Sequence, residues 1–229
     1  MQEVNGILVA AHELKAPLTR LRQLALSIDG ADFDTREICS EMVGVSERAI
    51  RQVNDLMKFR KLEGGLFEME PVMISALCDD VVREIAELFS FDRRSLKIRY
   101  SNRSKLVTAN RELLSSVIYN FLVNAVHYPG EKVRAELLVY ERSGRIQVSI
   151  RDFGPALSKD VWREMRQGFI SEPTSIAMRP GSSGLGLYIA SKFAKYMNAG
   201  VGAIRHRDGT SFFVELPVSK QVSLFEAGV

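Results

Sequence analysis

Cysteine is scarce in this chain. Of its 229 residues only Cys39 and Cys78 are cysteines, and they lie in separate helix-patterned segments without the spacing of a metal site. The pair therefore favours reduced, structural thiols over a disulfide framework or a zinc site.

Long hydrophobic runs and a strong net charge are also missing. No apolar stretch approaches the ~20 residues that a membrane-spanning helix needs, so no membrane span is expected within the chain. The net charge is only +3, and basic residues neither cluster nor alternate with aromatic ones, so nucleic acid is not expected as a partner. No Gly-x-x-x-x-Gly-Lys-Ser/Thr sequence occurs, which excludes a P-loop.

Near its start the chain has an ionisable side chain, that of His12, within a segment patterned as a long amphipathic helix. Apolar residues recur there at alternating steps of four and three, as in a coiled-coil seam, at Ile7, Ala11, Leu14, Leu18, Leu21, Ala25 and Ile28. His12 lies beside this seam, where its imidazole is expected to face solvent. Pro17 has no N–H to donate to the carbonyl of Glu13, which should loosen the helix just after His12. The segment is either a reaction site or a surface helix with an incidental histidine.

The chain divides at the glycine pair 64–65. Residues 3–28 and 35–63 are expected to form two long helices, each with one apolar seam. An isolated pair buries two such seams poorly, so a second copy is expected to complete a four-helix bundle, although the hairpin can instead pack on the rest of the chain.

The remainder has a mixed α/β pattern. Helices are expected at 74–90, 111–126 and 186–198, and strands at 96–100, 133–140, 146–152, 200–204 and 211–216. Two hairpins are expected, across the turns at 143–144 and 208–209. Residues 154–183 are irregular, and so long a stretch in a compact domain indicates a functional lid.

Four further motifs follow the His12 segment in a fixed order. They consist of Asn120 with Asn124, Asp152 with Gly154, the glycine-rich run 181–187, and the turn 208–210. Together with the His12 segment they resemble, in order and spacing, the H, N, G1, G2 and C-terminal glycine boxes of sensor histidine kinases. Each box alone is a weak signal, but five in the right order are a strong one, and the resemblance spans residues 3–217.

The resemblance implies an α+β chain of two domains. Residues 1–65 would be a helical hairpin that forms a dimeric four-helix bundle, and residues 66–218 a gyrase-like α/β sandwich that binds ATP and Mg²⁺, followed by a tail at 219–229. ATP would phosphorylate His12, and the phosphoryl group would pass to an aspartate on the receiver domain of a response regulator. A cytoplasmic location is expected, for the whole protein or for the cytoplasmic part of a larger or membrane-bound sensor.

The resemblance also assigns chemical roles. His12 would attack the γ-phosphorus through a neutral ring nitrogen, and Glu13 would orient the imidazole or act as general base, unless it is only a helix-surface carboxylate. Asn124 would be a Mg²⁺ ligand and Asn120 a neighbouring phosphate and metal contact, because an amide oxygen is a hard, neutral ligand. Asp152 would accept a hydrogen bond from the amino group of adenine.

The remaining nucleotide-binding candidates surround these groups. They are His127, Tyr128, Gly154, Phe169, Arg179, Gly184, Leu185, Gly186, Leu187 and Thr210. The glycine-rich run opens a helix, so its backbone N–H groups can face phosphate oxygens. Arg179 is otherwise a solvated arginine, Phe169 a core residue and Thr210 purely structural.

Three positions depart from the family pattern. Ala156 replaces the second glycine of G1, Ser182 replaces the first glycine of G2, and His127 replaces a lysine whose charge would meet a phosphate. They leave open a degenerate kinase that serves as a non-catalytic nucleotide-binding interaction module. A gyrase-superfamily ATPase or serine kinase is another alternative, against which the His12 helix argues because such proteins do not need it.

Overall fold

The structure is a computed structural model. It describes residues 2–28, 35–62, 64–91, 95–103, 105–126, 134–154, 159, 162–163 and 185–220. The chain divides into two compact units, Met1–Arg60 and Lys61–Val229, and each is described by itself. None of the helices described is both long and apolar enough to cross a membrane.

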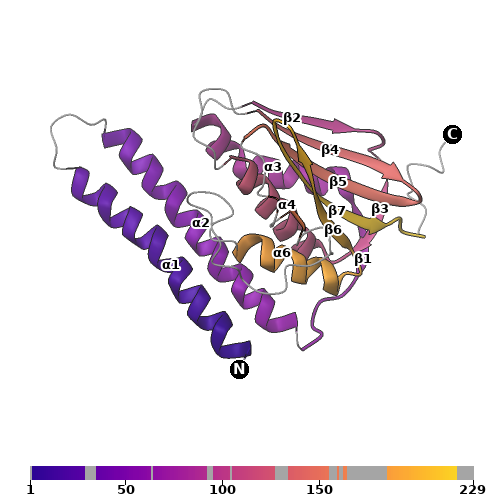
Figure 1. The fold of residues 1–229 in the computed structure, drawn as a ribbon, viewed down its shortest axis with the longest axis horizontal. Helices are drawn as coiled ribbons and strands as arrows, with labels where there is room; N and C mark the ends of the chain where they lie inside the picture. The colour runs from indigo at the N-terminus through magenta and orange to yellow at the C-terminus, as the bar shows by residue number, and fades with distance from the viewer. Residues whose placement is uncertain are drawn as a thin grey trace. The chain divides into compact units, whose positions relative to one another are not determined.

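The first unit is a helical hairpin. Helix α1 spans Gln2–Ser27 and helix α2 spans Thr35–Leu62, which confirms both expected helices (Figure 1). Pro17 lies inside α1, and the helix continues through it. An ion pair between Arg20 and Glu41, 2.6 Å long, joins the two helices, but both side chains are about half exposed and the pair adds little stability.

The apolar contact between the two helices differs from the expected single seam. Leu24 is buried together with Ile38 and Val45, and Leu21 packs against them. Leu24 does not belong to the expected seam, whereas Leu18, which does, is 60% exposed. Within one hairpin α2 therefore packs against the face of α1 that carries residues 21 and 24, and part of the expected seam stays exposed.

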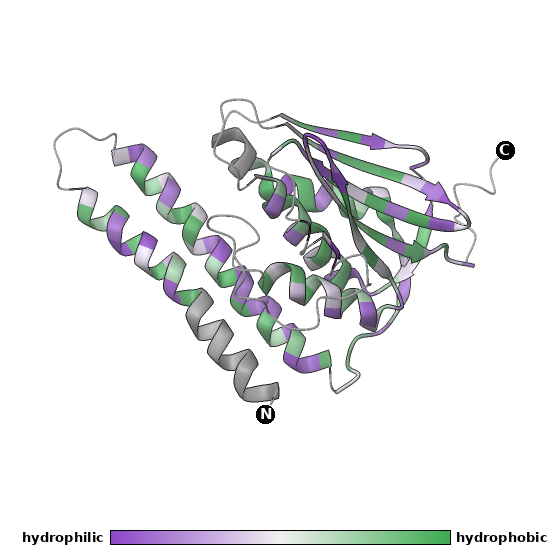
Figure 2. Ribbon diagram, in the orientation of Figure 1, coloured by the Kyte–Doolittle hydropathy of each residue, from purple (hydrophilic) through white to green (hydrophobic). Residues whose placement is uncertain are grey.

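A second apolar stripe on α2 stays uncovered within one hairpin. Val43, Ile50 and Met57 follow one another at intervals of seven residues, and each is between 55% and 59% exposed. Residues seven apart lie on one side of a helix, so these three form a continuous row. Figure 2 shows hydrophobic residues scattered along both described helices of the hairpin. The hairpin thus has more apolar surface than its own two helices cover.

The second unit is built on a five-stranded mixed sheet. Its strands lie in the order β2-β4-β5-β7-β6, with bounds Ser95–Tyr100 (β2), Arg134–Arg142 (β4), Arg145–Asp152 (β5), Gly200–His206 (β6) and Gly209–Pro217 (β7). Only β2 and β4 run parallel. The antiparallel pairs β4–β5 and β6–β7 confirm the two expected hairpins.

Three helices cover one face of this sheet, as Figure 1 shows. They are α3 (Ile74–Phe91), α4 (Arg111–Val126) and α6 (Leu185–Tyr196). The core between the layers is apolar, and Phe121 of α4 stacks on Phe212 of β7 with ring centroids 5.8 Å apart. The result is a two-layer α/β sandwich, as expected for this part of the chain.

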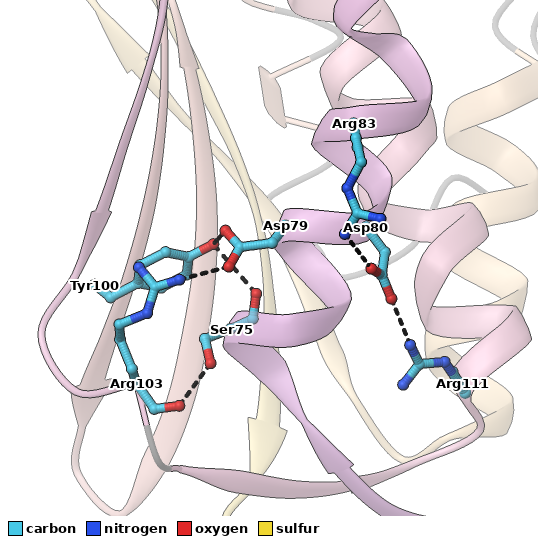
Figure 3. A network of polar contacts seen from close by, with 7 residues as sticks. All are labelled: Ser75, Asp79, Asp80, Arg83, Tyr100, Arg103 and Arg111. Carbon is cyan, nitrogen blue, oxygen red and sulfur yellow. Dashed lines mark hydrogen bonds and ion pairs between the residues drawn. The ribbon is translucent and has the colours of Figure 1, made fainter.

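A polar network fixes α3 to its neighbours (Figure 3). The Asp79 carboxylate accepts a hydrogen bond from the Tyr100 hydroxyl at 2.6 Å and pairs with Arg103. The next residue, Asp80, accepts a hydrogen bond at 2.6 Å from the guanidinium group of Arg111, the first residue of α4. Two adjacent carboxylates therefore hold α3 against β2 on one side and α4 on the other.

Two short strands were not expected from the sequence. β1 (Glu70–Met73) and β3 (Leu106–Ala109) form a separate antiparallel pair. Val218, just after β7, bridges to Val107 of β3. Strands of four residues carry too short an alternation to be recognised. The expected lid lies outside the described residues, apart from positions 154, 159 and 162–163.

Candidate functional site

The two asparagines of the second motif lie on α4 beside the start of α6. A Cβ atom added to Gly186 would lie 2.7 Å from Oδ1 of Asn120, closer than real Cβ atoms come to another heavy atom. A side chain at this position would force the Asn120 amide to move, so glycine lets the first turn of α6 lie beside this amide as it is oriented here. The N and G2 motifs, 66 residues apart in sequence, meet at this contact.

The Asn120 side chain is oriented by its own helix. Its Nδ2 donates to the carbonyl oxygen of Ser116 at 2.9 Å, which leaves Oδ1 directed at the first turn of α6. Asn124 lies one turn further along α4 and, like Asn120, is partly exposed. Amide oxygens beside a helix start are a donor set that suits phosphate-bound Mg²⁺, and the helix N-terminus suits the phosphates themselves.

The buried carboxylate of Asp152 organises the other half of the site. Its Oδ1 accepts hydrogen bonds from the backbone N–H groups of Gly154 and Thr210, both at 3.1 Å. The side chain has no exposed surface, and burial raises the pKa of Asp152 from 3.8 to about 6 although these bonds act in the opposite direction. A carboxylate held in this way ends β5 and faces the helix layer.

Gly209 allows β7 to begin against Asp152. Its φ is +140°, and a Cβ at this position would lie 2.1 Å from the carbonyl oxygen of Asp152. On the opposite face of the sheet, Arg151 pairs with Asp208 at 2.7 Å. Sequence reasoning missed this ion pair, because the partners meet only through the register of β5 on β7, which sets Arg151 opposite Ser211.

The two halves of the site are joined through the core. Asn120 precedes Phe121 on α4, and Thr210 lies two residues before Phe212 on β7, so the Phe121–Phe212 stack connects the two elements. The structure therefore places Asn120 and Gly186 together, and separately Asp152, Gly154 and Thr210.

The other candidate residues are either buried in the core or lie outside the described residues. Leu185 and Leu187 are buried in the core, so they can meet a ligand only through their backbone. The residues expected to bind nucleotide that lie outside the described ranges are His127, Tyr128, Phe169, Arg179 and Gly184. His12 and Glu13 belong to α1, in the other unit, and their side chains also lie outside the description.

Comparison with known proteins gives a family for this site. The family model of the histidine kinase-, DNA gyrase B- and HSP90-like ATPases matches residues 109–220. The alginate biosynthesis sensor protein KinB of Pseudomonas aeruginosa is 25% identical over 93% of this chain and 36% of its own length. The probable sensor histidine kinase TcrY of Mycobacterium tuberculosis is 26% identical over 91% of this chain and 44% of its own length.

A solved structure has the same fold. It is that of the histidine kinase ThkA in complex with the response regulator protein TrrA, at a TM-score of 0.58 and 16% identity, covering 92% of this chain and 61% of that one. The present chain spans less than half the length of KinB and TcrY. The match of residues 109–220 to this ATPase family and the fold confirm the expected gyrase-like ATP-binding sandwich, and this part of the chain is similar to the ATP-binding core of sensor histidine kinases.

Proposed function

We propose that this chain uses ATP to phosphorylate its own His12 and passes the phosphoryl group to an aspartate on a response regulator. The observation that carries the proposal is the contact between Gly186 and Asn120, which joins two motifs of the ATP-binding family. The ThkA structure contains a response regulator, which supports a receiver domain as the partner here.

Each part of the site has a distinct task in this proposal. Asp152 binds the amino group of adenine, and Gly154 and Thr210 hold the carboxylate in place through their N–H groups. The first turn of α6 receives the phosphates through its backbone. Mg²⁺, held by Asn124 with help from Asn120, would neutralise charge on the phosphates. His127, Tyr128, Phe169, Arg179 and Gly184 remain candidate nucleotide contacts.

The nucleophile is the neutral imidazole of His12. A ring nitrogen attacks the γ-phosphorus, the bond from this phosphorus to the β,γ-bridging oxygen breaks, and ADP leaves. Glu13 is proposed to orient the imidazole and to accept the proton from its other nitrogen. The phosphoryl group then moves to the receiver aspartate, which regenerates His12.

The proposal includes a homodimer. The row of Val43, Ile50 and Met57 is apolar and exposed in a single hairpin, and covering it in a second copy would remove this surface from water. Two hairpins packed in this way form a four-helix bundle.

The first prediction concerns which side chain is phosphorylated. Incubation with γ-labelled ATP and Mg²⁺ should give a label that is lost in acid and stable in base, as expected for a phosphoramidate on imidazole. His12→Ala and Asn124→Ala should both abolish it, whereas His206→Ala, a matched histidine on β6, should not. Acid-stable label, or label retained by His12→Ala, would contradict the histidine kinase proposal, and absence of label in the unmutated chain would favour a non-catalytic nucleotide-binding module.

The second prediction concerns Asp152. The pKa of this carboxyl is raised to about 6 in the folded protein, so between about pH 4 and 6 the folded chain binds more protons than the unfolded chain, and stability falls as pH rises. Asp152→Asn keeps an oxygen for Gly154 and Thr210 but removes the charge. It should raise the free energy of unfolding by about 2 kcal/mol at pH 8 and by much less at pH 4.

The same variant should bind ADP more weakly, because an amide N–H₂ replaces one acceptor that the adenine amino group requires. Urea unfolding followed by the fluorescence of Trp162, the only tryptophan, and calorimetric titration with ADP measure the two effects. A variant that is destabilised at pH 8, or that binds ADP as tightly as the unmutated chain, would show that Asp152 does not have this role.

The third prediction concerns assembly. Ile50→Glu places a charge in the middle of the exposed row, where a second copy would desolvate it at a cost of several kcal/mol. The dimer should dissociate to monomers at micromolar concentration, as measured by light scattering, while Ser101→Glu, at an exposed polar position of the other unit, should leave it intact. An unmutated chain that is monomeric under these conditions would overturn the dimer.

A further inference from the structure

The linker, defined here as residues 64–69, begins with two glycines that are hydrogen-bonded to the end of α2: Gly64 donates its N–H to the carbonyl oxygen of Lys61 at 3.2 Å, and Gly65 donates to that of Leu62 at 3.1 Å. Gly65 has a φ of +64°, and a Cβ there would meet nothing within 4 Å. Leu66 is 70% exposed. A left-handed glycine with open space on its side-chain face, next to an exposed residue, is a position at which the chain can pivot.

The second half of the linker is held by the last residue of α6. The Tyr196 hydroxyl accepts a hydrogen bond from the backbone N–H of Phe67 at 3.4 Å and donates one to the carbonyl oxygen of Phe67 at 3.2 Å. The two aromatic rings also meet edge to face, with centroids 6.0 Å apart. One side chain thus satisfies both backbone groups of a residue that belongs to no strand or helix.

The next linker residue is held by the cap of α4. Asn110 donates from Nδ2 to the carbonyl oxygen of Glu68 at 2.9 Å. Its Oδ1 accepts from the N–H of Leu113 at 3.1 Å, which caps the helix. Asn110 therefore has two separable functions, of which only the Nδ2 contact reaches the linker.

Both contacts lie at the far ends of the helices that carry the ATP-binding motifs. Asn110 precedes α4, whose later turns carry Asn120, and Tyr196 ends α6, whose first turn carries Gly186. The two helices run antiparallel, with the motifs at one end and the linker at the other. Twelve residues of α6 span about 16 Å, so a packed, rigid helix pair separates the linker contacts from the nucleotide.

We infer that Tyr196 and Asn110 are positioning residues for phosphoryl transfer. By fixing Phe67 and Glu68 they set the point at which the linker leaves the ATP-binding unit, so that this unit reaches the histidine by pivoting at the glycine pair 64–65. This inference rests on the proposed function, since it assigns a role in the transfer of phosphate to His12.

The expected loss of transfer rate depends on the length of linker that no contact fixes. With both contacts made, Phe67, two residues after Gly65, is the next fixed residue. Without them the next fixed residue is Glu70, the start of β1, five residues after Gly65. Effective concentration across a flexible tether falls roughly as the −3/2 power of its length, so the transfer rate should fall roughly three- to fourfold. Affinity for ATP should not change, because the nucleotide end of the helix pair is untouched.

The test uses two conservative variants in the full-length chain. Tyr196→Phe keeps the ring contact and loses both hydrogen bonds to Phe67. Asn110→Asp keeps the helix cap and places a carboxylate oxygen against the carbonyl of Glu68 in place of the donor. Tyr140→Phe, a partly buried tyrosine on β4, is the control for loss of a hydroxyl.

Two measurements separate this role from the proposed function. Amide hydrogen exchange at Phe67, whose N–H is bonded to the Tyr196 hydroxyl, should speed up roughly fivefold in Tyr196→Phe and more in the double variant, whether or not the chain is a kinase. Autophosphorylation by the double variant should show kcat roughly three- to fourfold lower with KM for ATP unchanged, and the control should match the unmutated chain.

The inference is overturned if exchange at Phe67 stays slow in Tyr196→Phe and in the double variant, because the contacts then do not hold the linker. It is also overturned if exchange speeds up while kcat is unchanged, or if KM for ATP rises together with the loss of kcat. An unmutated chain that forms no phosphohistidine would instead contradict the proposed function, and the exchange result would still report on the contacts.

Discussion

The close approach of α6 to α4 at Gly186 is the constraint on which the ATP-binding unit depends. Without a side chain at this position the helix start can lie beside the Asn120 amide, so that a helix N-terminus and an amide oxygen face the same place. The buried Phe121–Phe212 stack then connects this place with the strand end where Asp152 is held. In the proposed function, recognition of the phosphates therefore depends on the approach of the two backbones, with few charged side chains among the described residues of the site.

The two units differ in how much apolar surface they bury within one chain. The second unit has a continuous apolar core between helices and sheet, and Gly209 lets β7 begin close to the Asp152 carbonyl. Among its described side chains, the first unit buries a small apolar cluster around Leu24 and leaves the row of Val43, Ile50 and Met57 exposed. A hairpin of this kind suits a part that completes its core by association, whereas the ATP-binding unit has a complete core of its own.

Sequence periodicity predicted the long helices and the paired strands, because each has enough residues to repeat its pattern. It did not predict β1 and β3, which are four residues long. It did not show which face of α1 packs against α2 within one hairpin, since Leu18 and Leu24 are equally apolar and only the packing of α2 distinguishes them.

The candidate site was predictable where glycine and asparagine spacing marks it, as at Gly186 and Asn120. The contacts of Tyr196 and Asn110 with the linker carry no such signal, because an aromatic residue at a helix end and an asparagine cap are common in any helix. They become visible only when residues distant in sequence are placed together.

The central claim is that ATP binds where α6 meets α4, and calorimetric titration of Gly186→Ala with ADP and Mg²⁺ tests it most directly. The added methyl group would lie 2.7 Å from the Asn120 oxygen, so we expect affinity to fall at least tenfold while the fold, judged by circular dichroism, is kept. Gly200→Ala is the matched control, since its Cβ would make only ordinary contacts at 3.8 Å. Unchanged ADP affinity in Gly186→Ala would contradict this account of the site.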